Sequence, residues 1–327
     1  MRVASVALLT LTLSGAAPAI ARSPQTDLVT QRTRLPLVAM SSALRGLAAA
    51  AAPSHVATLS LPDAPVCALA DPDQDAYFVS SINGEGTIKD NNGYISRVAP
   101  DGRMIAQRFI QGGRAGTVLN APKGLAILGD ELWVADIDVV RSFDRHSGRP
   151  LRTVTMPAPG ALFLNEMATG PDGAAYVTDT RLDFRGQDAR HVGPDRIFRI
   201  SRAGAATVAL EDRLEAPSGI AWDPTMRRFL ITALQGTHIY AWRPGEASAT
   251  AVWQGVGGYD GIVVDGSRWL VSSFNGTGVY AIGDGREERI IEHLTTPAAI
   301  AFDFGRRQLL IPSFGANTLQ IWHVPGS

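Results

Sequence analysis

The chain has 327 residues, of which 45% are hydrophobic and 19% charged, and its formal net charge is −1. This balance excludes the basic surface that nucleic-acid binding needs and the polybasic patch that attracts anionic membranes. The 33 glycines and 20 prolines favour a turn-rich all-β protein, and the single cysteine, Cys67, excludes an intrachain disulfide.

The first element in chain order is a secretory signal, which we predict over residues 1–21. Arg2 supplies a positive start, residues 3–13 form a short apolar core, and Ala19-Ile20-Ala21 is a small-x-small cleavage site. The apolar core is too short to span a bilayer. We therefore expect an exported protein, periplasmic or secreted, with no membrane partner.

Residues 22–53 show no strand pattern, and we predict a linker there. Residues 35–52 are rich in alanine and could form a short helix, which Pro36 and Pro53 would bound. No residue of this segment carries a chemistry that the sequence identifies.

Residues 54–324 carry an internal repeat. The clearest copy, residues 259–282, has three short apolar runs separated by Asp265-Gly266 and Asn275-Gly276, which is typical of antiparallel strands joined by hairpins. Further copies begin near Pro65, Pro122, Leu164, Pro217 and Pro297. Six copies, with equivalent positions 38 to 57 residues apart, predict an all-β, six-bladed β-propeller.

The last copy ends near Trp322 and has room for only three strands. Residues 55–61, HVATLSL, precede the first copy and form a strand-like run that belongs to no copy. We predict that this N-terminal strand completes the last blade as its outer strand. Such closure would remove the open edge that an incomplete blade presents.

One position in each copy is expected to face a shared mouth of the central channel, just before the inner strand. Aligning the copies on Asp260 gives the ring Val66, Lys123, Asn165, Ser218, Asp260 and Ala298. Asp260 and Asn165 offer oxygens of the kind that Ca²⁺ or Mg²⁺ favours, and Glu166 is a further carboxylate candidate. Lys123 stands opposite Asp260 in a six-fold ring and could take the place of a cation. The ring is therefore a candidate metal site, a salt-bridged polar plug or a pocket for an anionic group.

Two long polar loops, residues 83–92 and 181–195, are expected to open on the same face as this ring. Long loops on a rigid scaffold are where binding and catalytic residues usually lie. These loops could bring Lys89, Asp90, Arg185, Asp188 and His191 toward the axis.

The segments LNEMATGPDGAAYVTD, PSGIAWDP and YDGIVVDGSRWLVSS resemble the gluconolactonase and regucalcin-like (senescence marker protein) family and, more loosely, NHL-repeat propellers. The resemblance implies a six-bladed propeller and, in the family's enzymes, a divalent cation at the mouth that polarises a lactone carbonyl and activates water. Among the implied ligand positions Asp260 and Asn165 match, with Glu166 where Asp is common. Val66 and Ser218 replace two of the family's usual ligands.

Two functions follow as hypotheses. The first is metal-assisted hydrolysis of lactones or related esters, with a divalent cation such as Ca²⁺ held by Asp260, Asn165 and Glu166. Lys123 or His191 would then act as electrophile or general base. The second is a non-catalytic propeller that binds a small molecule or a partner protein at the same mouth, because Val66 and Ser218 remove ligand capacity.

Overall fold

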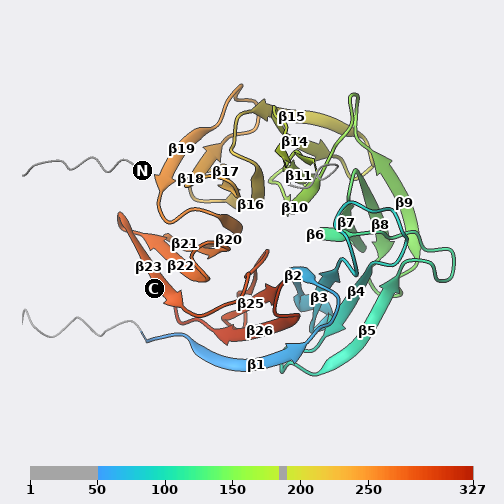
Figure 1. The fold of residues 1–327 in the computed structure, drawn as a ribbon, viewed down its shortest axis with the longest axis horizontal. Helices are drawn as coiled ribbons and strands as arrows, with labels where there is room; N and C mark the ends of the chain where they lie inside the picture. Colours follow the sequence, from blue (N-terminus) through green and yellow to red (C-terminus); the bar gives the residue numbers. More distant parts are fainter. Residues whose placement is uncertain (1–50, 184–189, 327) are drawn as a thin grey trace, which may run out of the picture. The chain divides into compact units, whose positions relative to one another are not determined.

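The computed structural model describes residues 51–183 and 190–326. Its strands form six four-stranded antiparallel sheets and one two-stranded hairpin, and the sheets stand as blades around a central axis (Figure 1). The predicted all-β, six-bladed propeller is thus confirmed. The only helical element in the described ranges is the 3-10 turn η1 (Pro72–Gln74). No helix within these ranges is long and apolar enough to cross a membrane.

Each blade runs from an inner strand at the axis to an outer strand at the rim. Blade 1 contains β2 (Pro65–Asp71), β3 (Ala76–Ser81), β4 (Tyr94–Val98) and β5 (Met104–Gln111). Blade 2 contains β6 (Pro122–Leu128), β7 (Glu131–Asp136), β8 (Val139–Asp144) and β9 (Pro150–Thr155). Blade 3 contains β10 (Leu164–Thr169), β11 (Ala175–Asp179), β14 (Asp195–Ile200) and β15 (Ala206–Asp212), with the small hairpin β12 (Leu182–Asp183) and β13 (Arg190–His191) inserted.

The second half of the ring repeats this order. Blade 4 contains β16 (Pro217–Asp223), β17 (Arg228–Ala233), β18 (His238–Trp242) and β19 (Thr250–Gln254). Blade 5 contains β20 (Tyr259–Asp265), β21 (Arg268–Ser273), β22 (Gly278–Gly283) and β23 (Arg286–Ile291). Blade 6 contains β24 (Ala301–Asp303), β25 (Gln308–Ser313) and β26 (Thr318–His323), and it takes its fourth strand from the other end of the propeller.

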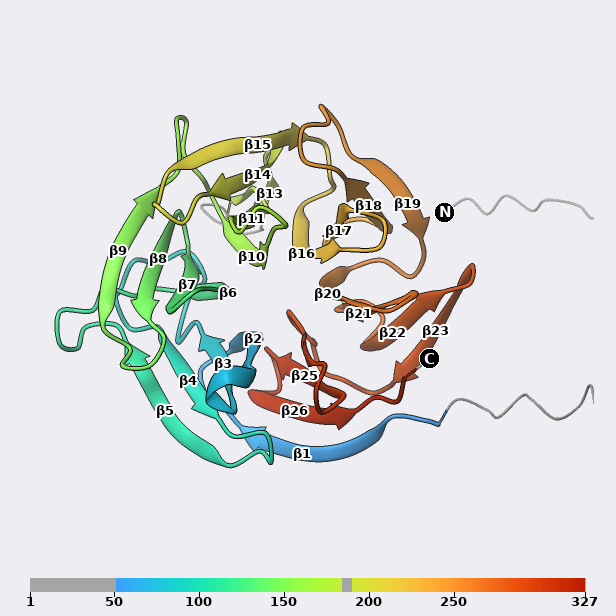
Figure 2. The same cartoon turned by 180° about the vertical axis from the view of Figure 1, so that it is seen from behind.

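That fourth strand is β1 (Ser54–Ser60), which pairs antiparallel with β26. Leu59 and Leu61 are buried against Leu319 and Ile321 of the last blade. Figure 2 shows β1 lying along the outside of β26, so the first and last strands of the propeller are neighbours. The predicted closure by an N-terminal strand is confirmed, and it satisfies backbone groups that would otherwise be an exposed edge.

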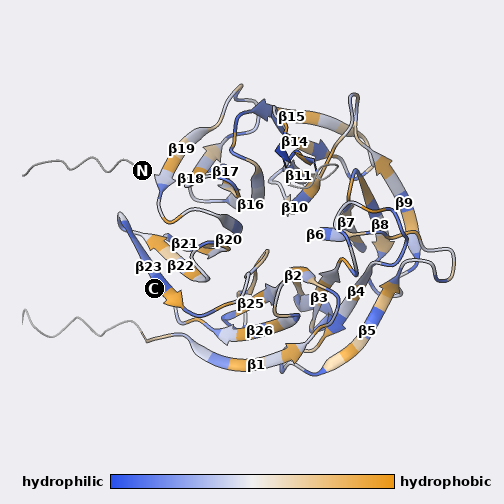
Figure 3. Ribbon diagram, in the orientation of Figure 1, coloured by the Kyte–Doolittle hydropathy of each residue, from blue (hydrophilic) through white to orange (hydrophobic). Residues whose placement is uncertain are grey.

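The hydrophobic core lies between adjacent blades. Every residue of β3 is buried, because each inner or middle strand is covered by a neighbouring sheet on both faces. Outer strands alternate instead: β5 changes repeatedly between exposed and partly buried residues, and Figure 3 shows hydrophilic and hydrophobic colours mixed along it. The burial pattern of each strand therefore follows its distance from the axis.

Hydroxyl groups near the ends of the second strands join the inner strands of neighbouring blades. Ser80 Oγ donates to the backbone carbonyl of Lys123 (2.7 Å) and accepts the N–H of Cys67 (3.2 Å). Equivalent hydroxyls bond in the same way to the next blade: Thr178 to Ser218 O, Thr232 to Asp260 O, and Ser272 to Ala298 O, at 2.6, 2.6 and 2.7 Å. The backbone of the ring positions is thereby fixed in four of the six blades.

The predicted signal sequence, residues 1–21, lies outside the described residues. So do residues 22–50 of the predicted linker and residues 184–189 of the second long loop.

Candidate functional site at the propeller mouth

The six ring positions occupy equivalent places in the fold. In five blades the position is the second residue of the inner strand, rather than the residue before the strand as expected from the sequence. In each of these five blades the position lies within a bulge or break in the strand register, as between Tyr259 and Ile262. Ala298 lies just before β24, next to an isolated bridge from Pro297 to Ser313. The bulge turns the side chain at this position toward the mouth.

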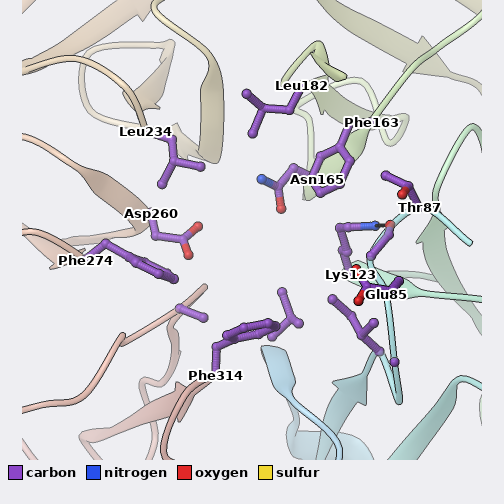
Figure 4. Close-up of a pocket in the computed structure, with 15 residues that line it drawn as sticks. Glu85, Thr87, Lys123, Phe163, Asn165, Leu182, Leu234, Asp260, Phe274 and Phe314 are labelled. Atoms are coloured by element: carbon purple, nitrogen blue, oxygen red, sulfur yellow. Dashed lines mark hydrogen bonds between the residues drawn. The ribbon is translucent and has the colours of Figure 1, made fainter. Parts of the chain in front are cut away.

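The mouth contains a cavity of about 440 Å³, within the usual size range for a small-molecule site. Five ring positions line it, and Ser218 lies behind them, fully buried. Figure 4 shows Asp260 and Phe274 on one side and Lys123, Thr87 and Glu85 on the other. The rest of the lining is mostly apolar: beside Asn165, Gly84 and Gly86 it consists of Val66, Ile82, Phe163, Leu182, Leu234, Ala298 and Phe314.

The Asp260 wall is a chain of hydrogen bonds. Asn165 Nδ2 donates to Ser218 Oγ (2.9 Å) and to Thr180 Oγ1 (3.1 Å). Ser218 Oγ in turn donates to Asp260 Oδ1 (2.6 Å). Burial raises the pKa of Asp260 to about 6, although the hydrogen bond from Ser218 opposes the shift. The carboxyl group therefore changes charge close to physiological pH.

The Lys123 wall holds a buried cation. Lys123 is 1% exposed, and its Nζ donates to the carbonyls of Gly86 (2.9 Å) and Ala121 (3.1 Å). The same nitrogen lies 4.2 Å from the centre of the Phe163 ring. Burial lowers the pKa of Lys123 to about 8, and the charge of Asp136 opposes this only in part. In the described ranges no carboxylate forms an ion pair with Lys123.

Glu166 lies next to the ring but does not line the cavity. Cys67 Sγ donates to Glu166 Oε1 (3.4 Å), and Oε2 is buried with no hydrogen-bond partner in the described structure. Burial and the charge of Asp260 raise the pKa of Glu166 well above its usual range. Burial also raises the pKa of the Cys67 thiol. These shifts favour the neutral carboxylic acid of Glu166 and the neutral thiol of Cys67.

The two long loops contribute unequally. The first supplies Glu85 and Thr87 to the cavity, while Lys89 of the same loop points to Asp138, with 2.6 Å between Nζ and Oδ2. The second supplies Leu182. His191 does not line the cavity, and its Nε2 lies 2.5 Å from Asp195 Oδ1 in the same blade.

Sequence reasoning missed the apolar lining, although the repeat contains its signal. The residue after the second strand is Ile82, Leu234, Phe274 or Phe314 in four blades, and each lines the cavity. In the sequence these residues end the segments YFVSSI, FLITAL, WLVSSF and LLIPSF. Aligning that position, as the ring position was aligned, would have predicted a hydrophobic rim.

The donor set does not fit a resident divalent cation. Within the described ranges no three His, Cys, Asp or Glu side chains gather in a group that could hold a metal ion. Of the ring positions that line the cavity, only Asp260 and Asn165 carry side-chain oxygens, and one oxygen of Asp260 already accepts from Ser218. The other carboxylate of the lining, Glu85, lies on the opposite side of the cavity (Figure 4). Ca²⁺ takes six to eight oxygen ligands, whereas here Val66 is apolar and Lys123 brings a positive charge.

Comparison with known proteins gives the family of this propeller. Residues 91–313 match the family described as SMP-30/gluconolactonase/LRE-like region. The chain belongs to this family. No curated protein matches this family member.

Solved structures similar to this SMP-30/gluconolactonase/LRE-like protein share its fold. A gluconolactonase from Xanthomonas campestris, important in glucose secondary metabolic pathways, is 19% identical with a TM-score of 0.62, and the match covers 84% of this chain and 95% of that one. A virginiamycin B lyase from Staphylococcus aureus, in a catalytically inactive form with quinupristin, is 14% identical with a TM-score of 0.54, covering 82% and 98%. At these identities the likeness shows the propeller fold alone.

Proposed function

We propose that the mouth cavity binds a small organic molecule with an apolar body and a head that carries acceptor oxygens, without a resident metal ion. The observation that carries this proposal is Lys123, a buried cation that lines an apolar cavity without a carboxylate partner in the described ranges. A buried charge is costly unless it is paired. A carbonyl or carboxylate oxygen of a ligand would supply the missing partner.

The two walls suit the two ends of such a molecule. The Lys123 wall offers a donor for an acceptor oxygen, and Asp260 on the opposite wall accepts a hydrogen bond from a hydroxyl or amide. Between them the phenylalanines Phe163, Phe274 and Phe314 favour an apolar or aromatic body over a polyhydroxylated one. Of the two partners predicted from the sequence, a small molecule and a protein, we propose the small molecule for this cavity.

Calorimetry with a phenyl-substituted butyrolactone and its open hydroxy acid tests the proposal against glucono-δ-lactone. We expect the phenyl compounds to bind, with unchanged affinity in the presence of a chelator. Lys123→Met is expected to weaken binding of the hydroxy acid about 10-fold or more, the value of a charge-assisted hydrogen bond. Lys89→Met, at an exposed lysine, is the matched control. Preference for glucono-δ-lactone, or loss of binding with chelator, contradicts the proposal.

Hydrolysis of a lactone or ester is the second candidate, favoured by family membership and by the pKa of Asp260. As a carboxylate, Asp260 would remove a proton from water as the water oxygen attacks the carbonyl carbon, and Lys123 would stabilise the developing oxyanion. The ring C–O bond then breaks and the alkoxide takes up a proton. Turnover followed by NMR, lost in Asp260→Asn while binding persists, supports this role. Binding without any product leaves the propeller a non-catalytic receptor.

We also propose that the protein acts after export, in the periplasm or outside the cell. The support is the charge and hydropathy pattern of residues 1–21. N-terminal sequencing of the protein recovered from its host is expected to find a chain that begins near Arg22. A cytoplasmic protein that retains Met1 contradicts the proposal.

A further inference from the structure

We propose that Lys123 is a nucleophilic amine, which captures aldehyde or ketone carbonyls entering the mouth cavity as a reversible imine. This inference rests on the proposed function for the cavity and its ligand class, but it adds a covalent bond that ligand binding does not require. Two features of the site carry it: the burial of Lys123 in the lining of an apolar cavity, and the lack of an ion pair between its Nζ and any carboxylate of the described ranges.

The hydrogen bonds of Nζ can be made by a neutral amine. Its two acceptors in the described structure are the backbone carbonyls of Gly86 and Ala121, at 2.9 and 3.1 Å. A neutral amine has two N–H groups, which can satisfy both carbonyls and leave the lone pair unused. An ammonium has a third N–H, which can face the Phe163 ring 4.2 Å away, so these contacts accommodate both the neutral and the charged form.

The charges around Nζ do not hold it firmly as an ammonium. Among the described residues Asp136 is the carboxylate whose charge opposes the fall in the pKa of Lys123, and its oxygens already accept from Arg141 Nε (2.6 Å) and from the N–H of Ala121 (2.8 Å). Glu85 lines the same cavity at its exposed edge but forms no ion pair with Lys123 in the described ranges. Desolvation therefore outweighs the attraction of Asp136, and the pKa of Lys123 falls to about 8.

Formation of the imine requires only the amine of Lys123, the carbonyl compound and exchange of protons with solvent. The lone pair of the neutral amine attacks the carbonyl carbon, so that a C–N bond forms and the π electrons move to oxygen. A proton passes from nitrogen to oxygen to give a carbinolamine. The hydroxyl group then leaves as water with a proton from solvent, while the nitrogen lone pair forms the C=N bond of an iminium, and loss of the remaining N–H proton to solvent gives the imine. Lysines desolvated in hydrophobic pockets use this chemistry with carbonyl substrates.

The chain itself supplies an internal control, because Lys89 and Lys123 are its only lysines. Lys89 is exposed and paired with Asp138, whereas Lys123 is buried beside an apolar cavity. Cleavage after arginine separates the two, since Arg97, Arg103, Arg108 and Arg114 lie between them. Both reactivities can therefore be read from one digest of the full-length protein.

The experiment incubates the protein with benzaldehyde and cyanoborohydride, which reduces any imine to a stable secondary amine, and quantifies each peptide by mass spectrometry. At pH 7.5 about a quarter of a lysine with a pKa near 8 is neutral, against about a thousandth of an ordinary lysine. We expect Lys123 to be labelled at least about 10-fold faster than Lys89. The rate should rise with pH around a midpoint near 8, and benzoate should protect Lys123 but not Lys89.

Equal labelling of the two lysines, or no protection by benzoate when calorimetry shows benzoate bound, overturns the inference and leaves the proposed function standing. Absence of benzoate binding, with Lys123 still labelled selectively, overturns the ligand class proposed for the cavity instead. Lys123→Arg, which keeps the charge but cannot form the imine, is expected to lose the label on that peptide. The wild-type comparison needs no variant, so the test holds even if Lys123→Arg folds poorly.

Discussion

Lys123 and Asp260 lie on opposite walls of one cavity (Figure 4), and both are almost fully buried. They differ in how the protein accommodates the charge. Asp260 accepts a hydrogen bond from Ser218, a side chain that Asn165 holds in turn, whereas Lys123 donates only to neutral backbone carbonyls. In the described ranges neither Asp260 nor Lys123 forms an ion pair, so burial moves both pKa values toward neutrality.

The comparison of the two walls shows that the cavity has an acidic group on one side and a basic group on the other. Between pH 6 and 8 both groups are mostly charged and both charges are desolvated, which destabilises the empty site. A ligand that places oxygens against Lys123 and a donor against Asp260 would relieve both penalties at once. This is a reason for a binding role that does not require a metal ion.

The largest loss of stability is expected from a substitution that displaces the backbone of the Asp260 wall. A Cβ at Gly261, the residue after Asp260, would lie 2.4 Å from the backbone nitrogen of Ile300, and backbone cannot give way as a side chain can. We expect Gly261→Ala to destabilise the protein by about 3 kcal/mol, at the upper end for overpacking. Urea unfolding measures this, with Gly305→Ala as a control because its Cβ would meet nothing closer than 3.4 Å. Equal effects of the two substitutions would mean that the inner strands are loosely packed.

The contribution of Asp260 to folding stability is expected to be larger at acid pH. The folded-state pKa of about 6 lies above the unfolded value of about 3.9, so the folded state binds more protons between these values. Stability relative to Asp260→Asn should therefore fall as pH rises from 4 to 6, by about 3 kcal/mol in all. Urea unfolding of both proteins across this range checks the sign. A constant difference would show that Asp260 is solvated in the folded protein.

The contribution of Lys123 to folding stability is expected to be larger at alkaline pH. Here the folded-state pKa of about 8 lies below the unfolded value of about 10.4, so the unfolded state binds more protons between these values. Stability relative to Lys123→Met should rise by about 3 kcal/mol as pH increases from 8 to 10.4. Unfolding measured at several pH values in this range gives the slope. A ligand with a carboxylate should flatten it, because the ligand stabilises the ammonium.

The fold could be predicted from sequence because each repeat records its own strands and turns. The ring could be predicted too, since one aligned position per copy fixes where Asp260, Asn165 and Lys123 meet. The hydroxyls that join blades could not be recognised, because Ser80 and Thr178 look like ordinary strand residues until the neighbouring blade is in place. The burial that shifts the pKa of Lys123 is likewise a property of the assembled ring.

The polar relay of the Asp260 wall gives a smaller effect. Ser218→Ala removes the donor to Asp260 and the acceptor for Asn165 while leaving the backbone unchanged. We expect a loss of about 2 kcal/mol, typical of buried groups left without a partner, and a pKa of Asp260 that rises further, because the lost hydrogen bond favoured the carboxylate. NMR titration and urea unfolding test these outcomes against Ser248→Ala, at an exposed serine. An unchanged pKa would indicate that Ser218 does not donate to Asp260.

The smallest effect on the mouth is expected at His191, which the sequence suggested as a general base. Its imidazole contacts Asp195 and does not line the cavity, so it belongs to neither wall. We expect His191→Ala to leave ligand affinity within about two-fold, while stability falls by about 1 kcal/mol as buried Asp195 loses a hydrogen bond. Asn165→Ala, on the Asp260 wall, is the comparison and should weaken binding. If His191→Ala instead reduces affinity 10-fold, His191 contributes to ligand binding and belongs to the site.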